Sequence, residues 1–185
     1  MSTVSPQPLP KEVYAIFSGE INGASVQRII NGVTSVMGQV EHIHLLFQSN
    51  GGYIGDGICL YNFFRALTLD LIIYNGGSVG SIAAIAFLGA KTRKTSKFGT
   101  FMIHRSHWSA NAATAARLQE AAESLRIDDA RTEAILRNHI ILSDEQWTAL
   151  NYKNLTFGAE EAVKIGFAIE IAEFTPPPGA RIFTA

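Results

Sequence analysis

The chain has 185 residues, of which 47% are hydrophobic, so it is long enough for one domain with a substantial core. Fifteen Lys and Arg residues against sixteen Asp and Glu residues leave a net charge of -1, which argues against a nucleic-acid partner and against binding to an anionic membrane. The single cysteine, Cys59, excludes an intramolecular disulfide, and we interpret it as a small core residue on a helix rather than a nucleophile or a metal ligand.

The ends of the chain differ in composition from its centre. Residues 1–12 are rich in Ser and Pro, and we interpret them as a disordered or extended stub; residues 13–174 form one domain, and residues 175–185, which contain three consecutive prolines, form an extended tail. The N-terminal residues lack the charged lead and apolar run of a signal peptide, and no stretch approaches the length of a membrane-spanning helix. We therefore expect a cytoplasmic location.

Short apolar runs alternate with helical patterns along the chain. The runs are brief, rich in β-branched or aromatic residues and bounded by Gly, Asn or charge, which predicts buried strands over residues 13–17, 43–47, 71–74 and 100–103. Apolar residues recur at helical spacing over residues 24–37 and 54–66, and each of these segments has the length of a crossover helix. This strand–helix–strand repetition predicts an α/β fold with a parallel sheet covered by helices.

The second half of the domain is predicted to be mainly helical. Residues 112–139 form a long, Ala-rich helical pattern in which Leu118, Leu125 and Ile135 offer only a narrow apolar seam, so we expect this helix to pack on another subunit. Ser143 has capping-box spacing before a short helix, and Gly166 is placed to end the last helix.

Three residues in one order supply the parts that acyl-transfer chemistry needs. Gly52, in the turn over residues 50–52, can present its N–H because no side chain blocks a close approach. Ser81 stands 29 residues later, after a Gly-rich loop and at a strand-to-helix turn, and His104 at the end of a strand can accept its proton. Each residue alone is common in a structural role, and only the joint order favours an active site.

A second serine offers an alternative nucleophile. Residues 76–80 fit the G-x-S-x-G pattern of α/β-hydrolases, which would make Ser78 the nucleophile of a small esterase. That fold needs a larger sheet, and its acid precedes its histidine, so we rank this alternative lower. His42 and His44 alternate along a strand without a third ligand nearby, so we predict no metal site.

Several segments together resemble the proteolytic subunit of the ATP-dependent Clp protease. They are residues 48–57, 77–84, 89–91, 101–104 and 159–166. The similarity runs over about residues 13–171 and keeps the spacing between Gly52 and Ser81 without a gap. Each segment is a weak signal, but as a set they are specific.

The resemblance implies a crotonase-like spiral of ββα units, with a protruding long helix for oligomer contacts. It also implies Ser81 as nucleophile, His104 as general base, and the N–H groups of Gly52 and Ile82 as the oxyanion hole. Such subunits form a ring-shaped homo-oligomer, possibly of stacked rings, into which an AAA+ unfoldase feeds unfolded polypeptides. This chain itself would need no cofactor, because the partner uses the ATP.

The sequence departs from the family pattern at the third member of the catalytic triad. Asn154 stands where the family has an aspartate; its amide oxygen can orient His104, but it cannot stabilise the imidazolium as a carboxylate does. Asn50 replaces a turn proline, residues 105–111 replace a Gly-rich substrate-binding segment, and the N-terminal extension is short. A weakly active or silent ring subunit is therefore the main alternative to an active peptidase, and a crotonase-type acyl-CoA enzyme ranks below both.

Overall fold

The structure, a computed structural model, describes residues 11–109 and 112–185, so most of the predicted N-terminal stub lies outside the described residues. The strands are β1 (Glu12–Ser18), β2 (His42–Ser49), β3 (Asp70–Gly80), β4 (Thr92–Thr95), β5 (Thr100–Ile103), β6 (Leu155–Gly158), β7 (Glu170–Ile171) and β8 (Ile182–Thr184). The helices are α1 (Gly23–Val36), α2 (Ile54–Ala66), α3 (Ile82–Phe87), α4 (Ala115–His139), α5 (Asp144–Ala149) and α6 (Ala159–Ile165).

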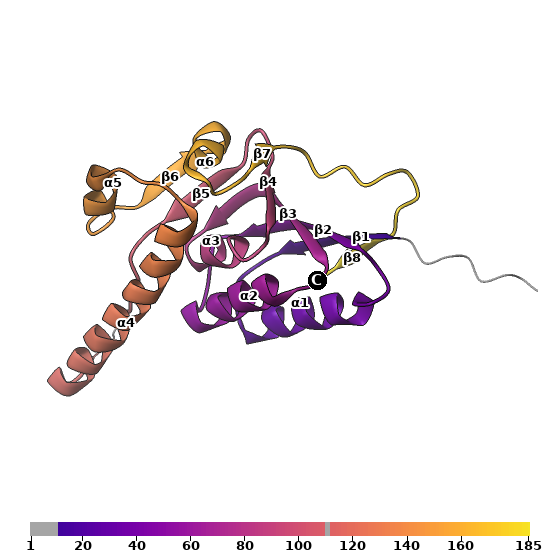
Figure 1. Ribbon diagram of the computed structural model, residues 1–185. Coiled ribbons are helices and arrows are strands. Elements are labelled where there is room, and N and C mark those ends of the chain that lie inside the picture. Colours follow the sequence, from indigo (N-terminus) through magenta and orange to yellow (C-terminus); the bar gives the residue numbers. More distant parts are fainter. Residues whose placement is uncertain (1–10, 110–111) are drawn as a thin grey trace, which may run out of the picture.

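One sheet organises the described part of the chain. Its strands follow the order β6-β5-β3-β2-β1-β8, and β4 and β7 branch from β3. Every strand pair in it is parallel except β5 with β6. Figure 1 shows α1 and α2 lying side by side along one face of this sheet. The predicted α/β fold with a parallel sheet covered by helices is confirmed.

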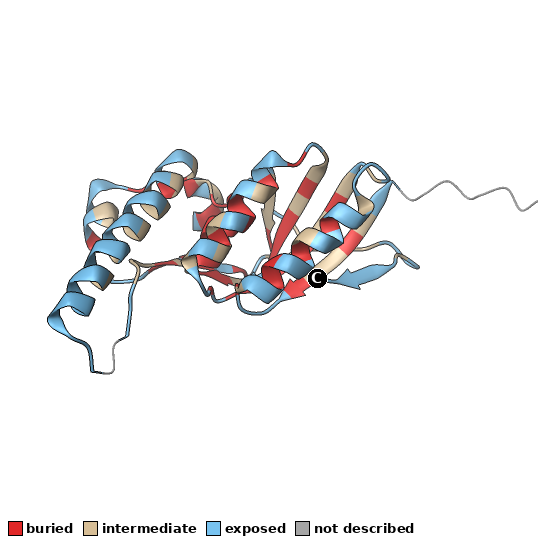
Figure 2. Cartoon of the chain, turned by 90° about the horizontal axis from the view of Figure 1, so that it is seen from below, coloured by how far each residue is buried: buried red, intermediate tan, exposed pale blue. Residues whose placement is uncertain are grey.

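The core lies between the sheet and the helices α1, α2 and α3. Four fully buried phenylalanine rings form a row in the core, each next to the following one with ring centroids 5.1 to 6.4 Å apart: Phe17, Phe47, Phe87 and Phe101. Burying a side chain of this size stabilises the fold by roughly 1.5–3 kcal/mol. Figure 2 shows the buried stripes of α1 and α2 against the sheet, and the outer faces of both helices exposed.

Cys59 lies on the outer face of α2 and is exposed, so its prediction as a core residue was wrong. The buried face of α2 is formed by Gly57, Leu60, Tyr61 and Phe64, which recur at helical spacing. Cys59 lies outside this buried face and is exposed to solvent. The residue type alone favoured burial, but the phase of the helix decided against it.

Strand β3 is much longer than the predicted strand over residues 71–74, because it continues through the glycines to Gly80. Its first half pairs with β4 and its second half pairs with β5. Asn75, fully buried, stands at this change of partner: its side chain accepts from the N–H of Gly77 at 2.9 Å and donates to the carbonyl of Thr100 at 2.9 Å. The expected Gly-rich loop before Ser81 is therefore a strand.

Helix α4 protrudes from the rest of the fold (Figure 1). It begins at Ala115, three residues after the predicted start, and over its 25 residues only Leu136 is buried. Leu118 and Ile127 are 51% and 65% exposed. Although it is the longest helix of the described residues, neither it nor any other described helix is long and apolar enough to cross a membrane.

The last residues return to the sheet. Ile182–Thr184 form β8, which pairs in parallel with β1 through Tyr14 to Ile16. The predicted tail over residues 175–185 thus includes a strand that covers the open edge of β1. Proline cannot donate a ladder hydrogen bond, so the chain joins the sheet only beyond residues 176–178.

Candidate active site

The structure brings Ser81 and His104 into direct contact. Ser81 follows β3 and precedes α3, His104 follows β5, and the parallel register of the two strands pairs Gly80 with Met102. The hydroxyl of Ser81 and Nε2 of His104 are 2.8 Å apart, and the N–H of Ser81 donates to the carbonyl of Met102 at 2.7 Å. Two strands that are remote in the sequence therefore fix a hydroxyl against an imidazole.

The backbone of Ser81 is strained. Its φ is 56° and its ψ is -133°, a combination that costs a residue with a side chain about 1–3 kcal/mol. Gly51 makes room for this turn, because a Cβ there would lie 2.6 Å from the Cβ of Ser81. A strained strand-to-helix turn is also the setting of the serine in the nucleophile elbow of α/β-hydrolases.

A cavity of about 130 Å³ joins Ser81 and His104 to Gly52 and Ile82, the two predicted oxyanion residues. Ile82 is the first residue of α3, so its N–H has no acceptor within the helix. Gly52 is held against Ile21, where an added Cβ would lie 2.0 Å from the carbonyl oxygen. Both residues thus line the cavity that holds the hydroxyl.

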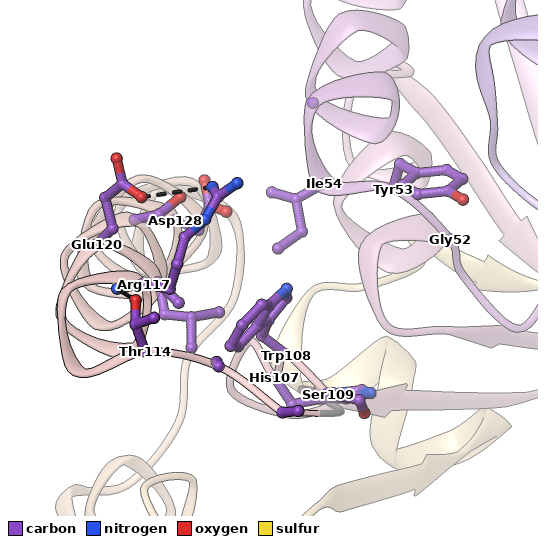
Figure 3. Close-up of a pocket in the computed structure, with 16 residues that line it drawn as sticks. Gly52, Tyr53, Ile54, His107, Trp108, Ser109, Thr114, Arg117, Glu120 and Asp128 are labelled. Carbon is purple, nitrogen blue, oxygen red and sulfur yellow. Dashed lines mark hydrogen bonds and ion pairs between the residues drawn. The ribbon is translucent and has the colours of Figure 1, made fainter.

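The rest of the cavity wall is mixed, with polar side chains from Ser106, His107 and Thr132 beside apolar ones. The apolar side chains come from four elements, and they include Ile54, Ile85, Ile103 and Leu136. A larger groove of about 1,060 Å³ continues from Gly52 between the start of α2, the segment after β5 and α4. Figure 3 shows how His107 and Trp108 lie in this groove between the side of Ile54 and Tyr53 and the side of α4.

His104 makes its second hydrogen bond to its own backbone neighbour. Its Nδ1 lies 2.6 Å from the carbonyl oxygen of Arg105, which can only accept, so Nδ1 carries the proton and Nε2 is free to accept from Ser81. The antiparallel pairing of Ile103 with Leu155 places Asn154 opposite His104. The side chain of Asn154 is exposed, and Nδ1 is bonded to Arg105 instead of to it.

Arg105 is anchored by its side chain. Its guanidinium forms an ion pair with Glu133 of α4 at 2.7 Å and donates to the amide oxygen of Asn151 at 2.8 and 3.1 Å. Desolvation opposes ionisation of Glu133, but hydrogen bonds from Arg137 and Arg105 outweigh it and lower the pKa of this carboxyl. Glu133 therefore stays charged at neutral pH and holds Arg105 in place.

The backbone next to Arg105 contacts a second carboxylate of α4. The N–H of Ser106 donates to Oδ1 of Asp129 at 2.7 Å. Neither this contact nor the carbonyl of Arg105 was predicted from the sequence, because no motif connects residue 129 with residues 105 and 106. A carboxylate on the long helix was the only available signal.

The alternative nucleophile has no base beside it. Ser78 lies on β3, and its hydroxyl donates to the amide oxygen of Asn50 at 3.4 Å. His44 stacks on Tyr14 with ring centroids 4.6 Å apart and is bonded to Tyr74 at 3.0 Å. Within residues 11–109 and 112–185, no group of three His, Cys, Asp or Glu side chains is arranged to hold a metal ion.

Comparison with known proteins agrees with the fold. The Clp protease family model matches residues 6–175. Among solved structures, a point mutant of ClpP1 from Listeria monocytogenes superposes with a TM-score of 0.75 at 18% identity, covering 89% of this chain and 92% of that chain. The search of curated proteins found no match.

The mostly parallel sheet covered by helices is thus similar to the fold of ClpP1. This chain belongs to the Clp protease family, whose members are in general serine endopeptidases. The expected family and the expected fold are both confirmed.

Proposed function

We propose that this chain is a serine endopeptidase that cleaves unfolded polypeptides or peptides, with Ser81 as nucleophile and His104 as general base. The observation that carries the proposal is the 2.8 Å hydrogen bond between their side chains, in a cavity that Gly52 and Ile82 also line. A serine hydroxyl becomes a nucleophile only when a base takes its proton, and the oxyanion that follows needs fixed donors.

The reaction follows from these positions. Ser81 Oγ bonds to the carbonyl carbon of the substrate while its proton passes to Nε2 of His104, and the N–H groups of Gly52 and Ile82 receive the negative charge on the carbonyl oxygen. Nε2 then gives the proton to the amide nitrogen as the carbon–nitrogen bond breaks. Water enters, loses a proton to Nε2 and releases the second product from Ser81.

The shape of the site favours a peptide substrate. The small cavity beside Ser81 is walled by apolar and polar side chains, among them Ile85, Leu136 and Thr132, and its size suits one side chain of the substrate next to the cleaved bond. The groove that continues past His107 and Trp108 is far larger than a small ester requires. We therefore favour an extended polypeptide over the esterase alternative that uses Ser78.

Assembly into a ring is part of the same proposal. Helix α4 exposes Leu118 and Ile127 and buries only Leu136, so it leaves apolar surface for a neighbouring subunit. Feeding by an AAA+ unfoldase that consumes ATP rests on family membership alone, and a cytoplasmic location stays a prediction.

We expect sedimentation at micromolar concentration to show a closed oligomer of several subunits. Ile127→Glu should weaken it, because a charge would be placed on the apolar surface of α4. Glu161→Gln, which changes an exposed residue of α6, serves as the control and should leave assembly unchanged. A stable monomer of the unaltered chain would contradict the ring.

The proposed nucleophile is tested by covalent labelling with a fluorophosphonate, followed by peptide mapping. We expect the label on Ser81, with complete loss in Ser81→Ala and a large decrease in His104→Ala, because the proton acceptor is then absent. Ser78→Ala should be labelled like the unaltered protein, since Ser78 is bonded to an amide rather than to a histidine.

Two other results would redirect the proposal. A label on Ser78 would favour the esterase reading. No label on any serine of intact oligomers would favour a silent ring subunit, which the substitution of the family aspartate by Asn154 supports.

A further inference from the structure

One peptide group of this chain is hydrogen-bonded at both of its polar ends. The carbonyl of Arg105 accepts from Nδ1–H of His104 at 2.6 Å, and the N–H of Ser106, in the same peptide group, donates to Oδ1 of Asp129 at 2.7 Å. With the 2.8 Å bond from Ser81 to His104, these contacts form a continuous series. A carboxylate, a peptide, an imidazole and a hydroxyl are thus joined end to end.

The peptide group can transmit the effect of the carboxylate. The described chain contains no cis peptide bond, so the N–H and C=O of this group point in opposite directions. A negatively charged acceptor on the N–H draws electron density toward the carbonyl oxygen, which strengthens the next hydrogen bond by about 10–30%. The carbonyl facing His104 is therefore a better acceptor than an isolated one.

Both sides of this peptide are fixed to α4. Asp129 and Glu133 stand four residues apart, on one face of the helix; the first holds the N–H of Ser106 and the second holds the guanidinium of Arg105. Asn151, beyond α5, holds the same guanidinium from another element. Rotation of the peptide away from His104 would break contacts on two elements.

We propose that Asp129 is a positioning residue that acts on His104 through the peptide between Arg105 and Ser106, in place of the acid of the catalytic triad. This inference rests on the proposed roles of Ser81 and His104. The carboxylate keeps the proton on Nδ1 of His104 and stabilises the imidazolium that forms when Ser81 attacks. Its effect is smaller than that of a carboxylate in direct contact, because a peptide group stands between them.

The titratable and charged groups around the imidazole come from two parts of the chain, the segment after β5 and helix α4. His107, in the same segment, has its ring 5.1 Å from that of His104. Asp129 and Glu133 face the segment from α4, and Glu133 is neutralised by Arg105 and by Arg137. Asp129 is thus the carboxylate that contacts the peptide group directly, whereas the cationic side chain of Arg105 lies against Glu133.

The test measures the rate at which a fluorophosphonate labels Ser81 as a function of pH, in intact oligomers. Asp129→Asn keeps an acceptor for the N–H of Ser106 but removes the charge, so we expect labelling about tenfold slower. The acid limb of the pH–rate profile should move to lower pH, because the imidazolium is less stabilised. Asp129→Ala should be slower still, and Glu123→Gln, which removes a charge from the exposed face of α4, should change neither quantity.

The outcomes separate this inference from the proposed function. If the unaltered protein is not labelled at Ser81, the proposed function fails and the role of Asp129 fails with it. If Ser81 is labelled but Asp129→Asn reacts at the unaltered rate, only the role of Asp129 is overturned. A slower reaction with an unmoved acid limb would also overturn it, since Asp129 would then only hold the loop. Thermal unfolding of Asp129→Asn should stay within a few degrees of the unaltered protein.

Discussion

Asn154→Asp is expected to raise peptide hydrolysis at neutral pH by up to a few powers of ten. The antiparallel pairing of Ile103 with Leu155 brings residue 154 next to the start of the segment with His104, so a carboxylate there can displace the carbonyl of Arg105 from Nδ1 and stabilise the imidazolium formed as Ser81 attacks. In a serine protease the reverse change, Asp to Asn in the triad, lowers turnover by ~10⁴. Stability should change little, because Asn and Asp are nearly isosteric and residue 154 is exposed.

The measurement is kcat for a short fluorogenic peptide, with the oligomer checked by sedimentation. Asn62→Asp adds the same charge to the exposed face of α2 and should leave kcat unchanged. In the Asn154→Asp protein, Asp129→Asn should cost less than in the unaltered protein, because a direct carboxylate replaces the effect through the peptide. An unchanged kcat in Asn154→Asp would show that the carbonyl of Arg105 keeps Nδ1 of His104.

Gly52→Ala is expected to lower kcat by about 10²–10³, the usual cost of losing one donor of an oxyanion hole. The added Cβ would lie 2.0 Å from the carbonyl oxygen of Ile21 and 2.8 Å from its carbonyl carbon, so the backbone must move and turn its N–H away from the cavity. The loss should appear in kcat more than in KM, because the oxyanion exists only after attack.

Gly32→Ala is the matched control for this substitution. Gly32 lies within α1 with nothing within 4 Å of the added Cβ, and alanine is the better helix former, so stability should rise by about 0.5–1 kcal/mol with unchanged kcat. Retention of full kcat by Gly52→Ala would remove this amide from the oxyanion hole and leave Ile82 as the only candidate donor.

Much of the fold could be predicted because local sequence carries its own physical signal. Apolar spacing predicted the helix over residues 54–66 and the strand over residues 100–103 at their observed bounds. The capping box at Ser143 begins α5, and the left-handed Gly166 ends α6, as predicted. Each of these features depends on a few neighbouring residues, so no distant contact was needed to recognise it.

The predicted site was less complete. Ser81, His104, Gly52 and Ile82 share one cavity, and each of them sits in a turn or at a strand end that the sequence marks by composition. The length of β3 was underestimated, because the side chain of Asn75 lets the strand pass from one partner to another. A buried amide that bonds the backbone of its own strand and that of β5 leaves no trace in hydrophobic spacing.

By itself, then, the sequence determined the α/β class, the order of the elements and the serine, histidine and glycine that meet in the cavity, since strand ends and tight turns depend on local residue type. The tertiary structure decided the exposure of Cys59 and the return of β8 to the sheet. It also decided which groups face His104. The carbonyl of Arg105 and the carboxylate of Asp129 reach it only because α4 packs beside the segment after β5, and contacts between residues so far apart depend on packing rather than on spacing.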